Sequence, residues 1–268
     1  TLVSVGAGDE VASEQEVGEL LEAAKAWAIE AGELVIGYYG GRLAYDDKLD
    51  GTPVTAADRG AEKMLRERIG THFPDHAVLG EEYGESSPGA RVRWVLDPVD
   101  ATRSFVRGVP LFGVLIGIEV AGEPVVGIAN FPALGEIVAA GRGLGCQWNG
   151  EPCRVSTTDS IEESLVLTTD MENVLAHPEG PGYRRLQQRA SIARTWGDCY
   201  GHCLVATGRA EVMVDPEMAP WDAAPFPTIV SEAGGKFTSL EGVVTMHGKS
   251  GISTNGRLHD EVLRELVG

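Results

Sequence analysis

One short stretch limits what this chain can fold into, because two aspartates interrupt an apolar run where a strand is expected to end. The run Trp94–Leu96 predicts a short buried strand, and Asp97-Pro98-Val99-Asp100 follows it directly. A helix start is predicted next, with Asp100 placed to cap it. Two carboxylates three residues apart at a strand end, beside a helix start, can hold a hard cation next to an anion site. The alternative is a capping Asp beside a turn Asp.

The charge of the chain restricts the partners it can have. Its 268 residues include 22 basic and 40 acidic side chains, a net charge of −18. Nucleic acids and anionic membranes both favour a positive surface, so neither is expected as a partner. A small molecule remains, and if that molecule is an anionic phosphate ester, a metal ion must invert the local field.

The cysteines and the apolar runs favour a cytoplasmic protein. Four cysteines are too sparse for a disulfide scaffold in a chain of this length, so they are expected to be buried thiols. No run approaches the ~18 apolar residues that a membrane span needs. The acidic N-terminal stretch lacks the basic-then-apolar order of a signal peptide.

The spacing of apolar residues predicts a mixture of helices and strands without an internal repeat, and therefore a layered α/β or α+β fold. A composition shift near residue 155 divides the chain into predicted halves, 13–155 and 156–268, within one compact catalytic unit. The polar segment 42–54 is expected to be a hairpin or an exposed loop. Helices are predicted at 13–35, 55–69, 183–190, 199–207, 221–233 and from 258 onward. Strands are predicted at 78–80, 94–96, 112–119, 124–130, 136–140, 165–169, 192–196, 211–214 and 251–254.

Five acidic residues share one context, the end of a predicted strand or the start of a predicted helix: Asp58, Glu81, Asp97, Asp100 and Asp222. Each has a structural explanation of its own, since Asp58 can complete a capping box with Thr55 and Asp222 can cap a helix. Together they are more informative, because like charges converge when a cation holds them. An oxygen-only set suits Mg²⁺, and the histidines show no metal-ligand spacing.

This residue set suggests a phosphoryl-transfer chemistry. A pair of hard cations ~3.5–4 Å apart can polarise a phosphoryl oxygen, generate hydroxide and stabilise a leaving alkoxide. Thr102 is placed to orient the attacking water, with Glu81 as the acceptor of its proton. The backbone N–H groups of Ala101 and Thr102 are placed to receive the phosphate.

Three motifs in order resemble the inositol monophosphatase family over nearly the whole chain. They are Gly80-Glu81-Glu82, the run from Asp97 to Phe105, and Trp221-Asp222-Ala223-Ala224 with Glu232-Ala233-Gly234-Gly235. The resemblance implies a layered αβαβα sandwich and a Mg²⁺-dependent, lithium-sensitive phosphomonoesterase, usually a homodimer.

The resemblance also implies roles for individual residues. Metal ligands would be Glu81, Asp97, Asp100, Asp222 and the backbone carbonyl of Val99. Asp58 and Lys48 would belong to the mobile-loop side of the site, where the family places a weaker third metal, and Thr102 would position the water. The family's usual Gly after the second Asp is Ala101 here, which restricts the backbone and crowds the site.

Within the family, residues 197–210 and 102–110 look most like histidinol-phosphate phosphatases. We therefore expect hydrolysis of L-histidinol phosphate, with Asp198 and Asp215 facing the non-phosphate part of the substrate. Asp198 as a simple cap of the following helix is the structural alternative. Two other functions stay open: an inositol, cyclitol or sugar phosphatase, and an inactive relative acting as a binding or regulatory subunit.

Overall fold

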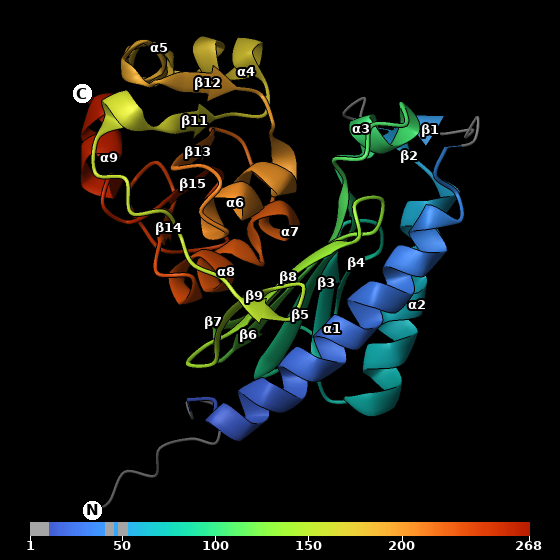
Figure 1. The fold of residues 1–268 in the computed structure, drawn as a ribbon. Coiled ribbons are helices and arrows are strands. Elements are labelled where there is room, and N and C mark those ends of the chain that lie inside the picture. Colours follow the sequence, from blue (N-terminus) through green and yellow to red (C-terminus); the bar gives the residue numbers. More distant parts are fainter. Residues whose placement is uncertain (1–10, 41–45, 48–52) are drawn as a thin grey trace, which may run out of the picture.

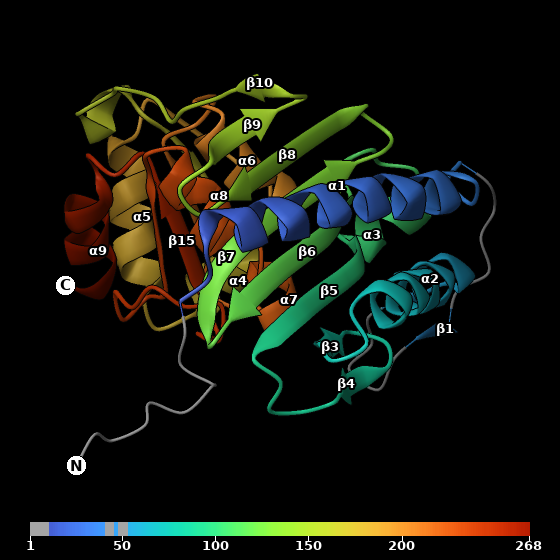
Figure 2. The same cartoon turned by 90° about the horizontal axis from the view of Figure 1, so that it is seen from below.

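The chain forms five alternating layers of helices and sheets, as Figures 1 and 2 show. A computed structural model describes residues 11–40, 46–47 and 53–268. Two helices cover one face of an eight-stranded sheet, three helices fill the space between this sheet and a five-stranded sheet, and three more cover the far side. This is the αβαβα sandwich that the resemblance implies. None of the described helices is long and apolar enough to cross a bilayer.

The large sheet has the strand order β10-β9-β8-β7-β6-β5-β3-β4. Its strands are β3 (Ala77–Gly80), β4 (Gly84–Ser86), β5 (Val92–Asp100), β6 (Gly113–Val120), β7 (Glu123–Phe131), β8 (Glu136–Gly141), β9 (Gly145–Trp148) and β10 (Glu151–Pro152). The predicted strands of the first half are all present. One prediction needs correction, because β5 continues through Asp100 instead of ending at Leu96. The strands β9 and β10 were not predicted from the sequence.

The outer helices α1 (Glu14–Ile36) and α2 (Ala56–His72) begin as the sequence predicts. The Ser13 hydroxyl accepts the N–H of Glu16, and Thr55 and Asp58 form a reciprocal capping box. The ends lie close to the predicted ones, since α1 stops at Ile36 instead of residue 35 and α2 stops at His72 instead of residue 69. The two short strands β1 (Asp46–Asp47) and β2 (Pro53–Val54) pair as a hairpin, and the predicted site residue Lys48 lies outside the described residues.

The small sheet has the order β12-β11-β13-β15-β14, with parallel and antiparallel pairs. Its strands are β11 (Leu165–Leu167), β12 (Ile192–Arg194), β13 (Val212–Asp215), β14 (Lys236–Thr238) and β15 (Gly251–Thr254). The far layer consists of α4 (Met171–Ala176), α5 (Gly180–Arg189) and α9 (His259–Val267), with the 3-10 turn η1 (Ile161–Glu163) beside it. Apolar residues of β13, α5 and α9 form one core cluster on this side of the sheet.

The helices between the sheets are α6 (Asp198–Ala206), α7 (Pro220–Ala223) and α8 (Phe226–Glu232). A single helix predicted over residues 221–233 is wrong, because the chain breaks at Ala224-Pro225. Proline has no backbone N–H and clashes with the preceding turn, so a continuous helix is disfavoured there. The break gives the short helix α7 its own direction.

This α7–α8 break lies against the large sheet at two glycines that leave no room for a side chain. A Cβ on Gly117 would meet the carbonyl oxygen of Ala224 at 2.5 Å, and one on Gly127 would meet that of Pro225 at 2.1 Å. Both obstacles are backbone atoms, so neither can move aside cheaply. The glycines of β6 and β7 therefore set how closely α7 approaches β5.

We expect Gly127→Ala to push the α7–α8 break away from the sheet and to destabilise the protein by about 1–3 kcal/mol, the usual cost of overpacking. Gly70→Ala is the matched control, because Gly70 lies in α2 and a Cβ added there would meet no atom within 4 Å. That variant should gain about 0.5–1 kcal/mol from helix propensity. Urea unfolding of the three proteins measures both values, and equal effects at the two glycines would contradict this packing.

Candidate active site

Asp97 and Asp100 lie at the buried end of β5, where the strand changes register. The pairing of β5 with β6 shifts between these two residues, and such a bulge re-aims the side chains around it. Only 2% of Asp97 and 9% of Asp100 is exposed. The Asp97 carboxylate accepts the N–H of Val99 at 3.0 Å.

Asp100 does not cap the following helix, which corrects the sequence prediction. The residue before α3 (Thr102–Val106) is Ala101, and no side chain caps that helix. The Asp100 carboxylate instead accepts the backbone N–H of Cys199, at 2.9 Å, from the start of α6. This bond connects the large-sheet layer to the helices beneath the small sheet. The sequence contains no local signal for it, because the partners are 99 residues apart.

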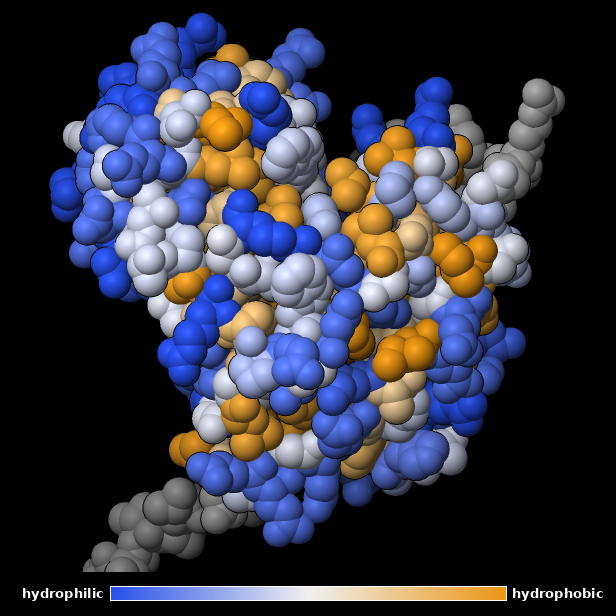
Figure 3. All heavy atoms as spheres, viewed as in Figure 1, coloured by the Kyte–Doolittle hydropathy of each residue, from blue (hydrophilic) through white to orange (hydrophobic). Residues whose placement is uncertain are grey.

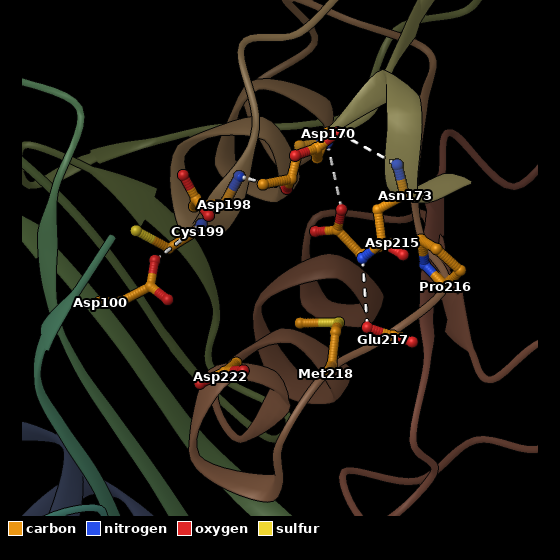
Figure 4. A pocket seen from close by; sticks show the side chains of 11 residues that line it. Asp100, Asp170, Asn173, Asp198, Cys199, Asp215, Pro216, Glu217, Met218 and Asp222 are labelled. Atoms are coloured by element: carbon orange, nitrogen blue, oxygen red, sulfur yellow. Dashed lines mark hydrogen bonds between the residues drawn. The ribbon is translucent and has the colours of Figure 1, made fainter. Parts of the chain in front are cut away.

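Asp222 reaches the same point from α7. Carboxylate oxygens of Asp97, Asp100 and Asp222 lie within 4.8 Å of one another, a spacing at which they can hold one metal ion. The Asp222 carboxylate also accepts the N–H of Ala219 at 2.8 Å, so the residue helps to start its helix as well. Figure 4 shows Asp100 and Asp222 on one side of a cavity, with Asp198 and Asp215 around its rim.

Burial and mutual repulsion act on the acidity of these carboxylates. Burial, followed by the charges of Glu81, Asp100 and Asp222, raises the pKa of Asp97 well above its ordinary range. Burial and the nearby charges of Asp198 and Asp222 do the same to the pKa of Asp100. Burial raises the pKa of Asp222 to about 6. Three carboxylates placed this close together repel one another when all are ionised, so the cluster is more stable when it binds protons or a cation.

Glu81 lines a neighbouring cavity that shares Asp100 and Asp222 with the one in Figure 4, and the turn that follows Glu81 is fixed by a residue that the sequence did not point to. Glu81 follows β3 and donates its N–H to the carbonyl of Leu96 on β5. The fully buried carboxylate of Glu62 accepts the next two backbone N–H groups, those of Glu82 at 2.7 Å and Tyr83 at 3.2 Å. A Cβ on Gly80 would collide with this carboxylate, which explains the glycine before Glu81.

Thr102 and Asp58 lie next to each other beside the acidic cluster. The Thr102 hydroxyl donates to the carbonyl of Val99 at 2.9 Å and lies 3.4 Å from the Asp58 carboxylate. Asp58 is buried in its capping box with Thr55, and this burial raises its pKa. The structural explanation of Asp58 is therefore correct, and it leaves room for a second role through its contact with Thr102.

Two non-glycine residues of the site have left-handed backbones. Ala101 has φ +63°, and Asp198 has φ +50°. Such conformations cost roughly 1–2 kcal/mol for residues with a Cβ. The resemblance places a glycine at position 101, and the structure shows why, since glycine adopts this conformation without strain. Strain of this kind often marks a functional site, where the surrounding fold maintains it.

Asp198 and Asp215 both line the cavity, as the sequence predicted, but they differ in their bonding. The Asp215 carboxylate accepts the N–H of Thr169 at 3.2 Å and contacts Nε2 of His202 at 3.3 Å. The buried His202 ring also contacts the Ser253 hydroxyl at 2.7 Å, so this ring fixes the position of the Asp215 carboxylate. Neither Thr169 nor His202 was singled out from sequence, although Thr169 ends a predicted strand.

Asp198 is not a helix cap. It is the first residue of α6, its side chain makes no capping bond, and its backbone N–H donates to the Thr169 hydroxyl at 2.7 Å. Within the described part of the chain, no donor bonds its carboxylate. Burial and the charges of Asp215 and Asp222 raise the pKa of Asp198 to about 7.

The carboxylates open onto a hollow of about 340 Å³ between α3 and the small-sheet side. Figure 3 shows the surface hollowed at this place. The cavity is lined by Glu81, Asp97, Val99, Asp100, Ala101, Thr102, Arg103, Thr169, Asp170, Asp198 and Asp222. The fold thus brings together every site residue predicted in its described part, except that Asp58 reaches the cavity through Thr102 and Asp215 lines the neighbouring cavity shown in Figure 4.

We expect Asp97→Asn to stabilise the metal-free protein while removing most of its metal affinity. The pKa of Asp97 in the folded protein is raised above its ordinary 3.8, so the folded state holds a proton there that the unfolded state has already released. The stability that this proton contributes is lost as pH rises from about 4 through the raised pKa. Asparagine does not ionise, so the variant avoids this loss, which amounts to about 1.4 kcal/mol of folding free energy for each unit by which the pKa is raised.

Thermal unfolding in chelator between pH 4 and 8 measures this effect. The advantage of Asp97→Asn over the parent protein should grow with pH. The exposed Asp260→Asn is the control and should show no such growth. An advantage for Asp97→Asn that shrinks as pH rises would contradict a raised pKa at this site.

Comparisons with known proteins agree with this geometry. A histidinol-phosphatase of Chlorobaculum parvum is 48% identical over 216 residues, which cover 80% of this chain and 83% of that protein. A histidinol-phosphatase of Mycobacterium tuberculosis is 40% identical over 232 residues, covering 84% and 88%. The crystal structure of the extragenic suppressor protein suhB from Bartonella henselae superposes with a TM-score of 0.86 at 28% identity, covering 92% of this chain and 98% of that one.

A family model describes the whole region from α1 to the end of the chain. The model of the inositol monophosphatase family matches residues 16–268, which include every acidic residue of the cavity. Together with relatives of 40% and 48% identity over most of their length, this match shows that the chain belongs to the inositol monophosphatase family.

Proposed function

We propose that the protein is a Mg²⁺-dependent phosphomonoesterase that hydrolyses L-histidinol phosphate to L-histidinol and phosphate. The observation that carries the proposal is the position of Asp198 beside the cluster of Asp97, Asp100 and Asp222. A carboxylate cluster suits a metal-assisted phosphate site, and a further, partly buried carboxylate next to it suits an ammonium group. The two relatives described above carry the name histidinol-phosphatase.

The donor set fits the metal ion that this family implies. All candidate side chains in the cavity offer oxygen, which Mg²⁺ prefers, and three of them already converge, with Asp97 and Asp100 buried and Asp222 partly buried. Asp97, Asp100, Asp222, Glu81 and the Val99 carbonyl would hold two ions, with a third and weaker one on the Asp58 side. When bound, Mg²⁺ supplies Lewis acidity to the phosphoryl oxygen and lowers the pKa of a nearby water.

The residues of this chain would position the reactants. Thr102 lies beside Asp58 and can present a lone pair to the attacking water, and Glu81 is the acceptor of the water's proton. The first turn of α3 leaves backbone N–H groups of Ala101 and Thr102 without intrahelical acceptors, and these receive the phosphate. Lys48, expected on the loop side of the site, lies outside the described residues.

Asp198 and Asp215 would bind the leaving group of the substrate. Histidinol carries an ammonium group, whereas an inositol offers hydroxyls. Asp198 has no donor among the described residues, so its carboxylate is the better ammonium acceptor. Asp215 already accepts bonds from Thr169 and contacts His202, and it would supply charge rather than a new hydrogen bond. A homodimeric, cytoplasmic enzyme remains our expectation from the sequence.

Metal removal tests the reaction class. Exhaustive chelation should abolish hydrolysis of L-histidinol phosphate, and Mg²⁺ should restore it, because the cluster needs a cation to bind an anionic phosphate. Phosphate release is measured before chelation, after it and after Mg²⁺ is returned. Full activity in chelator would rule out the proposed site.

Asp198→Asn tests the substrate. Asparagine tolerates a left-handed backbone well, so the variant keeps the fold and removes only the charge. We expect kcat/KM on L-histidinol phosphate to fall about ten- to a hundredfold, the worth of one charge-assisted hydrogen bond. The matched substrate is inositol 1-phosphate, on which the variant should lose little. Equal losses on both esters would move the assignment to an inositol or sugar phosphatase.

A further inference from the structure

Two of the four cysteines face each other across a hairpin at the edge of the large sheet. Cys146 lies on β9, and Cys153 directly follows β10. The strands pair Trp148 with Glu151 and Gln147 with Pro152, so Cys146 and Cys153 form the next pair. The N–H of Cys153 donates to the carbonyl of Cys146 at 3.0 Å, and their Sγ atoms are 3.4 Å apart.

The hairpin turn fixes this register. Asn149 has φ +52° and Gly150 has φ +83°, which is the Asn-Gly pattern of a tight two-residue hairpin turn. Because directly opposed residues point to the same face, both thiols must lie on one side of the ribbon. A hydrogen-bonded pair has its Cα atoms about 5.5 Å apart, within the usual range for a disulfide. The sulfurs need only approach from 3.4 Å to about 2 Å.

The surroundings favour Cys153 as the reactive member. Cys153 is half-buried, whereas Cys146 is almost fully buried, with only 3% of its surface exposed. Hydrogen bonding with Cys146, aided by the positive charge of Arg209, lowers the pKa of Cys153 despite its burial. The thiolate is the nucleophile in thiol chemistry, so Cys153 should react first.

The guanidinium of Arg209 is held in place beside the pair. It lies 4.2 Å from the centre of the Trp148 ring on the same hairpin, and it bonds Glu136 at 2.9 Å and the Tyr200 hydroxyl at 3.1 Å. It therefore contacts β9, β8 and α6 at once. A fixed cation next to a half-buried thiol is a recurring environment of reactive cysteines.

We propose that Cys146 and Cys153 are a redox modification site at which hydrogen peroxide produces a reversible intramolecular disulfide. The Cys153 thiolate attacks the peroxide oxygen, the O–O bond breaks, and the distal oxygen leaves as hydroxide, giving a sulfenic acid. The Cys146 sulfur then attacks the Cys153 sulfur, and water leaves with the thiol proton of Cys146. Overall, two thiols and one peroxide give one disulfide and two water equivalents, and a dithiol reverses the change by exchange.

The other two cysteines provide an internal control. Cys199 and Cys203 lie four residues apart on α6, and both are buried. Burial raises the pKa of each, so neither supplies the thiolate that starts the reaction, as Cys153 does. Tryptic cleavage after Arg142 and Arg154 places Cys146 and Cys153 together in peptide 143–154, whereas cleavage after Arg194 and Arg209 places Cys199 and Cys203 in peptide 195–209. Each pair can thus be followed separately.

The test treats the reduced, full-length native protein with a few equivalents of hydrogen peroxide, followed by denaturation, alkylation, digestion and mass spectrometry. Peptide 143–154 should lose two hydrogens and take no alkyl group, and denatured thiols should fall from four to two. Peptide 195–209 should be alkylated twice. Dithiothreitol added before alkylation should restore all four thiols.

Cys146→Ser and Cys153→Ser are the matched variants, and each should give no intramolecular disulfide. In Cys146→Ser, the remaining Cys153 should gain oxygen instead, because its sulfenic acid has no partner. Double alkylation of wild-type peptide 143–154 after peroxide treatment would overturn the proposal, as would a cross-link to peptide 195–209. These outcomes are independent of the substrate, so they leave the proposed phosphatase function untouched.

Discussion

The structure depends on keeping three mutually repelling carboxylates together in a buried place. Asp97, Asp100 and Asp222 come from two different layers, and burial together with their mutual charges disfavours full ionisation. No local interaction brings them together. The register shift in β5 directs the first two, and the break between α7 and α8 delivers the third. The close approach of that break to Gly117 and Gly127 sets the distance between the layers.

Contacts between the layers also hold strained backbones and buried charged residues around the carboxylate cluster. The left-handed backbones of Ala101 and Asp198 face the cavity from opposite layers, and the bond from Cys199 to Asp100 connects those layers. Behind them, the buried Glu62 fixes the turn after Glu81, and His202 holds Asp215. A cation would relieve the repulsion that these contacts impose, so metal affinity and fold stability should be coupled.

Much of this could be predicted from the sequence, because local patterns carried it. Capping boxes at Ser13 and Thr55 marked two helices, apolar runs marked the strands, and acids at strand ends marked the site. Two of the features that were missed depended on distant partners. Asp100 looked like a cap because its acceptor role toward Cys199 has no sequence signal, and Glu62 was missed because it acts on a turn 20 residues away. The Ala224-Pro225 break was missed although the proline was visible, because apolar spacing continues across it.

Anomalous scattering from crystals soaked in Mn²⁺ can establish whether the carboxylates of Asp97, Asp100 and Asp222 form a cation site. Mn²⁺ prefers the same oxygen ligands as Mg²⁺. We expect an anomalous peak bounded by oxygens of these three side chains, at roughly 2.0–2.3 Å from each ligand. Well-ordered crystals at neutral pH with no peak between these three side chains would contradict it.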